Sequence, residues 1–169
     1  MFLSEEFQPI AAIATTPSGV YCLQRLEQSP KFTIWTSDTI ATINTRSYSG
    51  SLRSHLEQIW DHHRSFVFCL ATGAVVRLIA PLLKDKATDP AIVVIDESGK
   101  FVISLCGGHQ GGADRLTQAI ALQLGAIPVL TGASNRLKLP GIDVLGVPFG
   151  WRKGDGDWTG VSAAIAGQD

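Results

Sequence analysis

Short apolar runs of strand length alternate along most of the chain with longer segments whose apolar residues recur at helical spacing. The apolar runs predict strands at residues 9–16, 32–37, 65–72, 91–96, 101–106 and 126–131. Helices are expected between them at residues 19–28, from about 49 to 62 or 63, at 74–83 and at 113–125. This alternation is typical of an α/β domain with a mainly parallel sheet.

Two segments refine the expected sheet. Residues 65–72 are apolar almost throughout, which favours a central strand. Residues 97–100 are few enough to form a hairpin turn, so one antiparallel pair is expected within the sheet. We therefore predict a mixed, mostly parallel sheet flanked by helices, in a doubly wound three-layer sandwich. The polar residues 38–48 are expected to form a loop, and residues 126–131 a buried last strand.

The composition of the chain changes near its C-terminal end. From Gly132 onward the sequence is rich in Gly, Pro, Asn, Asp and Trp, with few apolar runs. A chain of 169 residues is long enough for one domain with a proper core and too short for two ordinary ones. We assign residues 1–132 to the α/β domain and residues 133–169 to the start of a linker or second module.

Charge and cysteine content exclude several classes of protein. A net charge of −1 and a pI near 6.4 argue against a protein that binds nucleic acid or a membrane surface. No apolar run reaches the roughly 18 residues that span a bilayer, and the N-terminus does not resemble a signal peptide. The three cysteines lack zinc-site spacing, so we expect buried free thiols, no metal site and a cytoplasmic protein.

Two segments are candidates for a ligand site, because ligands of open α/β sheets bind where strands lead into helices. Residues 71–73 begin the helix that carries Arg77. Residues 107–114 contain four glycines, which would let the backbone approach a ligand and present amides at the positive end of a helix. The spacing matches neither a dinucleotide fingerprint nor a P-loop. An anion site and a simple tight turn therefore remain equal alternatives.

His109 stands among these glycines, where it could exchange a proton near neutral pH. A loop histidine bonded to a backbone carbonyl is the alternative, and the sequence alone favours it because no nucleophile is evidently paired with His109. The other histidines, His55, His62 and His63, fall on or at the end of a predicted helix, where we expect surface or capping residues.

Cationic side chains could form a local pocket in this nearly neutral protein. Arg77 is the only charge in its predicted helix, so it must either pair with a carboxylate, such as Asp89 or Asp96, or face a ligand. Lys84 and Lys86 lie close by in the sequence, in a segment that could equally be a solvated connector. Together these residues would suit a polycarboxylate. Asp96, before the hairpin, is expected to be a turn residue.

The run ATGAVVRLIAPLLKDKATDPAIVVIDESGKFVISLCGGHQGGADRLTQAIALQLGAIPVLTGAS, residues 71–134, closely resembles the N-terminal domain of the CbiG family. The features that carry the resemblance occur in order: TG, the arginine and AP, then KDK and DPA, the VV.D strand end and the GHxGGA loop. Members of this family are cobalt-precorrin-5A hydrolases of the anaerobic cobalamin (vitamin B12) pathway.

The resemblance implies a hydrolase that opens the ring A δ-lactone of cobalt-precorrin-5A and yields cobalt-precorrin-5B and acetaldehyde. It implies no cofactor, because cobalt is carried by the substrate, a corrinoid rich in carboxylates. His109 or Asp89 would activate water. The residues that would bind substrate are Thr72, Gly73, Arg77, Lys84, Lys86, Gly107, Gly108, Gly111 and Gly112.

This sequence departs from the family pattern in two ways. The family loop usually reads SGHxGGAN, whereas Gly107 and Asp114 stand here at its first and last positions, and an aspartate near a helix start repels an anion. Complete members also carry a C-terminal domain, and residues 133–169 resemble the region that precedes it. A complete active site would then need residues outside this chain, supplied by that domain.

Two rival functions follow from the same residues. The first is a non-catalytic corrinoid-binding module that hands an intermediate to a fused or associated precorrin methyltransferase. The second is a nucleotide-binding domain that uses the glycine loop for phosphate, although no standard phosphate motif is present. Neither nucleic acid nor a membrane is an expected partner.

Overall fold

The computed structural model describes residues 3–26, 30–108 and 111–132, and beyond them Gly154, Gly156, Asp157, Gly160, Val161 and Ala164. The chain divides into two compact units, Met1–Val129 and Leu130–Asp169. The first unit contains the described sheet. The boundary predicted between residues 132 and 133 stays a prediction, and the catalytic candidate His109 lies outside the described residues.

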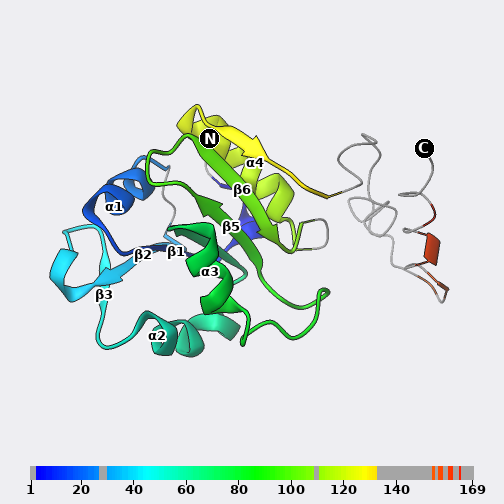
Figure 1. Ribbon diagram of the computed structural model, residues 1–169, viewed down its shortest axis with the longest axis horizontal. Coiled ribbons are helices and arrows are strands. Elements are labelled where there is room, and N and C mark those ends of the chain that lie inside the picture. The colour runs from blue at the N-terminus through cyan, green and yellow to red at the C-terminus, as the bar shows by residue number, and fades with distance from the viewer. Residues whose placement is uncertain are drawn as a thin grey trace. The chain divides into compact units, whose positions relative to one another are not determined.

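One seven-stranded sheet organises the described part of the first unit, in the order β3-β2-β1-β4-β5-β6-β7 (Figure 1). The strands are β1 (Ile10–Ala14), β2 (Phe32–Ser37), β3 (Arg46–Tyr48), β4 (Ser65–Cys69), β5 (Ala91–Ile95), β6 (Phe101–Cys106) and β7 (Ile127–Val129). The first five are parallel, β6 is antiparallel to β5, and β7 is parallel to β6. The predicted mixed, mostly parallel sheet is confirmed, with β4 central.

Helices cover both faces of this sheet (Figure 1). The helices α1 (Pro17–Gln24) and α4 (Ala113–Leu124) pack on one face, and α2 (Leu52–Ile59) and α3 (Thr72–Ile79) on the other. Short 3₁₀ turns are η1 (Glu5–Phe7), η2 (Asp38–Ile40) and η3 (Trp60–His62). The doubly wound three-layer architecture is therefore confirmed.

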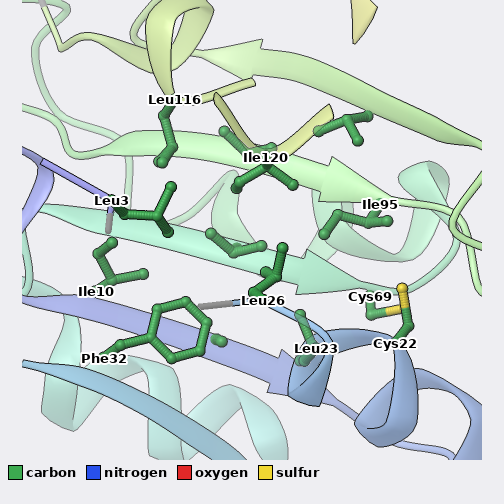
Figure 2. Packing of buried hydrophobic residues seen from close by; sticks show 14 of the residues in the cluster. Leu3, Ile10, Cys22, Leu23, Leu26, Phe32, Cys69, Ile95, Leu116 and Ile120 are labelled. Atoms are coloured by element: carbon green, nitrogen blue, oxygen red, sulfur yellow. The ribbon is translucent and has the colours of Figure 1, made fainter. Parts of the chain in front are cut away.

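Alternate residues of the central strands supply two separate cores. Ile10 and Ala12 of β1 face the core under α1 and α4, whereas Ala11 and Ile13 face the core under α2 and α3. Figure 2 shows the first core, in which side chains of α1 and α4 meet those of β1, β2, β4 and β5. Every residue of β1, β4 and β5 is buried, as expected for parallel strands covered on both faces.

Local sequence sets the ends of the helices. The Thr16 hydroxyl accepts a hydrogen bond from the Gly19 amide, and Pro17 occupies the first turn, so α1 begins two residues before the predicted Gly19. It ends at Gln24, short of the predicted residue 28. Gly125 closes α4 in the left-handed region with a φ of 66°, which confirms it as the predicted C-cap.

Two predictions about strands were wrong. The segment 38–48, expected to be a loop, returns to the sheet and forms β3, which pairs with the end of β2 through Trp35 and Arg46. Residues 126–131 were expected to form a buried strand, but β7 is short and Ile127 is 52% exposed. The strand lies at the edge of the sheet, where nothing in the described unit covers its outer side.

None of the helices in the described residues is long and apolar enough to cross a membrane.

His55 was expected at the surface and is instead 7% exposed on α2. Its ring lies with its centroid 4.5 Å from that of Trp35 and 4.8 Å from that of Tyr48, which it stacks against. Its Nε2 atom has no hydrogen-bond partner among the described residues. Burial, and secondarily the charge of His63, hold the pKa of His55 below its ordinary value of 6.5. The neutral ring is therefore the form that packs between β2, β3 and α2.

We expect the free energy of unfolding to fall as the pH drops below about 6.5, the ordinary pKa of histidine, because unfolded His55 binds a proton more readily than the buried ring does. The variant His55→Phe keeps an aromatic ring without a titrating group, so its stability should vary less between neutral and mildly acidic pH. Urea unfolding across this range measures the difference. The exposed His62→Gln variant is the control, and an equal loss of pH dependence there would contradict the assignment.

Candidate functional site

The carboxyl ends of β1, β4 and β5 form one edge of the sheet, where the order of the strands reverses between β1 and β4. The Glu97 carboxylate lies here after β5. It accepts a hydrogen bond of 2.9 Å from the Thr16 hydroxyl and one of 3.1 Å from the Ser18 hydroxyl at the start of α1. Sequence reasoning missed this contact, although a Thr-Pro helix start directly after a buried strand is a recognisable signal.

The first group of predicted site residues also lies at this carboxyl edge. Thr72 and Gly73 begin α3, and the exposed Arg77 side chain folds back along its own helix. Its Nη1 atom donates a hydrogen bond of 2.9 Å to the Gly73 carbonyl. Within the described residues Arg77 makes no ion pair with Asp89 or Asp96, the carboxylates proposed as internal partners. The guanidinium therefore remains at the surface beside Gly73.

Asp96 is a turn residue, as predicted. Its carboxylate accepts hydrogen bonds from the Ser98 amide and hydroxyl and from the Phe101 amide, which closes the turn between β5 and β6. Partial burial raises the pKa of Asp96, but these hydrogen bonds outweigh it and the pKa lies below its ordinary value. The Asp96 carboxylate therefore serves to stabilise the β5–β6 hairpin.

The second group of predicted site residues lies at the opposite edge. Because β6 runs antiparallel to β5, Cys106 at its end pairs with Ile92 near the start of β5. The glycine loop that follows therefore lies at the amino edge of the sheet, where a Cβ atom on Gly107 would meet the Pro90 carbonyl at 3.1 Å. The connector from α3 to β5, with Lys84, Lys86 and Asp89, reaches the same edge.

The structure thus divides the predicted site in two. Thr72, Gly73 and Arg77 lie at the carboxyl edge, and the remaining described candidates lie at the amino edge. The two edges are separated by the length of β5, which is about 16 Å for a strand of five residues. The remaining described candidates are Lys84, Lys86, Asp89, Gly107, Gly108, Gly111 and Gly112.

Asp89 stabilises the conformation of the connector between α3 and β5, residues 80–90. Its two carboxylate oxygens accept the Lys84 amide at 3.0 and 3.1 Å, and its own amide donates to the Asp85 carbonyl at 2.8 Å. The Lys84 ammonium group lies 3.7 Å from the Asp61 carboxylate, with both side chains well exposed, so this pair contributes about 0–1 kcal/mol at most. Asp89 also acts on its neighbour Cys106, whose pKa is raised by burial and then by this carboxylate.

The described glycines on either side of residues 109–110 lie against each other. A Cβ atom on Gly111 would lie 2.8 Å from the Gly107 carbonyl oxygen, which leaves no room for a side chain. Gly107 and Gly112 have φ values of 72° and 82°, in the left-handed region that favours glycine. Backbone conformation and packing therefore explain why glycine stands at positions 107, 111 and 112, without reference to a ligand.

The start of α4 is already occupied by the protein's own groups. The Ala113 amide donates to the Gly107 carbonyl at 3.0 Å, and the Asp114 amide donates to the Gly108 carbonyl at 3.1 Å. The Asp114 side chain is buried, with its Oδ1 atom 3.1 Å from the position that a Cβ atom on Gly108 would take. An anion at this loop would have to bind the amides of the loop itself, against the negative charge of Asp114.

The described residues contain no group of three or more His, Cys, Asp or Glu side chains that could hold a metal ion. His109, the residue with the most versatile chemistry in the predicted site, lies outside the described residues.

Comparison with known families gives two matches. A family model described as cobalamin synthesis G N-terminal, CbiG_N, matches residues 54–135. A second model, described as cobalamin biosynthesis central region, CbiG_mid, matches residues 140–169. The two matches follow one another along the chain, and the first includes the whole run, residues 71–134, that resembles this family by its motifs.

Curated relatives carry one name. A cobalt-precorrin-5A hydrolase of Priestia megaterium is 43% identical over 127 residues, which are 75% of this chain and 34% of the relative. A cobalt-precorrin-5A hydrolase of Salmonella typhimurium is 38% identical over 148 residues, 88% of this chain and 42% of the relative. The chain therefore spans between a third and a half of the length of these relatives.

A solved structure shares the fold. The crystal structure of a putative cobalamin biosynthesis protein G homolog from Sulfolobus solfataricus superposes with a TM-score of 0.55 and 26% sequence identity. The superposition covers 75% of this chain and 38% of that one.

We expect Gly111→Ala to lower the free energy of unfolding by about 1–3 kcal/mol, because the added Cβ atom would collide with the Gly107 carbonyl in a well-packed loop. Gly73→Ala is the matched control. There the Cβ atom would meet only the end of the flexible Arg77 side chain at 3.3 Å, and alanine favours the helix by about 0.5–1 kcal/mol. Urea denaturation measures both changes, and equal losses would contradict the described loop.

We expect Asp89→Asn to lower the pKa of Cys106, because it removes one of the two causes that raise it. The alkylation rate of Cys106 is measured across a pH series by mass spectrometry of its peptide. The pH profile of this rate should shift to lower pH. Asp85→Asn changes a carboxylate of the same connector that does not act on Cys106, and should leave the profile in place. An unchanged profile in Asp89→Asn would show that the Asp89 carboxylate does not lie close enough to Cys106 to affect its pKa.

Proposed function

Because the chain belongs to the CbiG family of cobalamin-biosynthesis proteins, we propose that it supplies the N-terminal part of a cobalt-precorrin-5A hydrolase. The observation that carries this proposal is the identity of 43% and 38% to two relatives of that name over most of this chain. The reaction would open the ring A δ-lactone and release acetaldehyde, leaving cobalt-precorrin-5B. The substrate would bring the only metal, so the protein would need no cofactor of its own.

The amino edge of the sheet is the proposed position of the substrate. The connector 80–90 and the glycine loop, which precede and follow the β5–β6 hairpin, meet there beside the half-buried Cys106. The carboxylates of the corrinoid would bind the ammonium groups of Lys84 and Lys86, which are exposed. The start of α4 is less suited to a carboxylate because Asp114 and the carbonyls of Gly107 and Gly108 already occupy it.

His109 is the proposed base that activates water for attack on the lactone carbonyl. It follows Gly108 in a loop without other large side chains on either side of the 109–110 pair. Asp89 is the weaker candidate, because both of its carboxylate oxygens accept the Lys84 amide. We assign Asp89 to positioning the connector and its lysines. Amides of Gly108 and Gly111 would stabilise the oxyanion that forms during attack.

The carboxyl-edge group has a separate role in this proposal. This group would bind a different carboxylate from the one at the glycine loop, because the two edges are a strand's length apart. Its members are Thr72, Gly73 and Arg77. The carboxylate bound here could belong to the far side of the macrocycle or to the C-terminal domain of the family. The cytosol is the proposed compartment, consistent with free thiols at Cys22 and Cys69.

Anaerobic incubation with cobalt-precorrin-5A tests the proposal, with acetaldehyde as the readout and the visible spectrum as the measure of binding. The assay uses this chain alone and joined to the remaining length of a family member. We expect His109→Ala to lower the rate of acetaldehyde release by about 10²–10⁴-fold, the usual contribution of a general base. His62→Ala, an exposed histidine on η3, should keep full activity.

The possible outcomes separate the two leading functions. Binding without acetaldehyde, even in the extended chain, would instead support a non-catalytic module that passes the corrinoid to a precorrin methyltransferase. Absence of both binding and release would overturn the substrate. Full activity in His109→Ala together with a large loss in Asp89→Asn would transfer the role of base to Asp89.

A further inference from the structure

Two cysteines from distant parts of the sequence meet in the core under α1. Cys22 lies near the end of α1, and Cys69 is the last residue of β4. Both are buried, at 2% and 0% exposure, and neither is in a disulfide. Figure 2 shows the two sulfur atoms side by side, and both residues belong to the same buried cluster.

The surroundings of the two thiols are different. A Cβ atom on Gly99, in the turn between β5 and β6, would lie 3.2 Å from the Cys22 sulfur and 3.3 Å from Nη1 of Arg25. The Arg25 guanidinium is held in place by a hydrogen bond of 3.3 Å from its Nη2 atom to the Leu124 carbonyl. Cys69 instead contacts the Asp96 carbonyl, 3.9 Å from its sulfur, so its neighbour is an acceptor.

These contacts shift the pKa values of Cys22 and Cys69 in opposite directions. The neighbouring Cys69 thiol lowers the pKa of Cys22, against a smaller effect of burial, with help from the Arg25 guanidinium. The proximity of Cys22, and then burial, raise the pKa of Cys69. Of the two thiols, Cys22 is thus the one that loses its proton more readily. An attacking thiolate and a resolving thiol are the two partners that disulfide formation requires.

We propose that Cys22 and Cys69 are a reversible redox modification site, which hydrogen peroxide converts into a disulfide between α1 and β4. Nothing in the proposed hydrolase reaction uses these residues, and they lie in the core below the carboxyl edge, away from the glycine loop. Peroxide is the oxidant chosen because it is small and uncharged, and because the Cys22 sulfur lies directly beneath the short turn at Gly99.

The chemistry balances in two steps. The Cys22 thiolate attacks one oxygen of peroxide, so that an S–O bond forms, the O–O bond breaks and one molecule of water leaves after protonation. The Cys69 sulfur then attacks the Cys22 sulfur, so that the S–S bond forms, the S–O bond breaks and a second molecule of water leaves with the proton of Cys69. The two thiols lose two electrons in total, and peroxide is reduced to water.

The disulfide would stabilise the fold, since it closes the chain between residues 22 and 69, which contains β2, β3 and α2. It would also tie α1, whose start is anchored by Thr16 and Ser18, to the end of β4. Oxidation would therefore make the carboxyl edge of the sheet more rigid without changing a residue at the surface.

Peroxide treatment of the purified chain at neutral pH tests the site. After alkylation of the remaining thiols and digestion without reductant, mass spectrometry should find one cross-linked peptide pair that contains Cys22 and Cys69. Dithiothreitol should separate the pair. The oxidised chain should melt at a Tm higher by on the order of 5–10 °C, a difference that reduction removes.

Three variants provide the controls, with far-UV circular dichroism to check the fold of each. Cys22→Ala and Cys69→Ala should each lose the cross-link and the rise in Tm, whereas Cys106→Ser should keep both, because Cys106 lies at the other edge of the sheet. Sulfinic acid on either buried cysteine, a cross-link through Cys106, or two unmodified thiols after treatment would overturn the proposal. The peptide map of the unmutated chain decides this even if a variant fails to fold.

Discussion

Complete burial of β1, β4 and β5 is the constraint on which the rest of this structure depends. Parallel strands that are buried at every residue need apolar cover on both faces, and α1 and α4 provide it on one face while α2 and α3 provide it on the other. Because α1, α2 and α3 each return the chain from the carboxyl edge to the amino edge, the connections of the parallel strands divide their functional groups between two edges. The position of every candidate residue follows from this division.

The reversal of chain direction at β6 decides what the amino edge contains. A further parallel strand would have delivered the glycine loop to the carboxyl edge, beside Thr72 and Gly73. The hairpin closed by Asp96 instead sends β6 back, so that the loop meets Asp89 and its connector at the start of β5. A single tight turn thus brings together the glycine loop and the lysine-bearing connector, which the sequence places on either side of β5.

Buried polar and sulfur groups show how the packing sets chemical properties. Burial keeps His55 neutral between two aromatic rings, and the turn at Gly99 encloses Cys22 beside a guanidinium and a second thiol. At the start of α4, by contrast, backbone carbonyls and Asp114 satisfy or oppose the groups that an anion would use. The same helix terminus that looks like an anion site from its glycines is therefore partly filled by the protein.

The sequence by itself determined the α/β class, the central position of β4, the hairpin between β5 and β6, the C-cap at Gly125 and the family, because these depend on local periodicity, turn residues and short motifs. It missed β3, because that strand is short and polar and is recognised only by its pairing with β2, and it expected β7 to be buried although β7 lies at the edge of the sheet. Nor could it separate Arg77 from the glycine loop, bury His55 or pair Cys22 with Cys69. Those arrangements join residues far apart in the chain, so only the tertiary structure decides them, through the direction of each strand and the packing of each face.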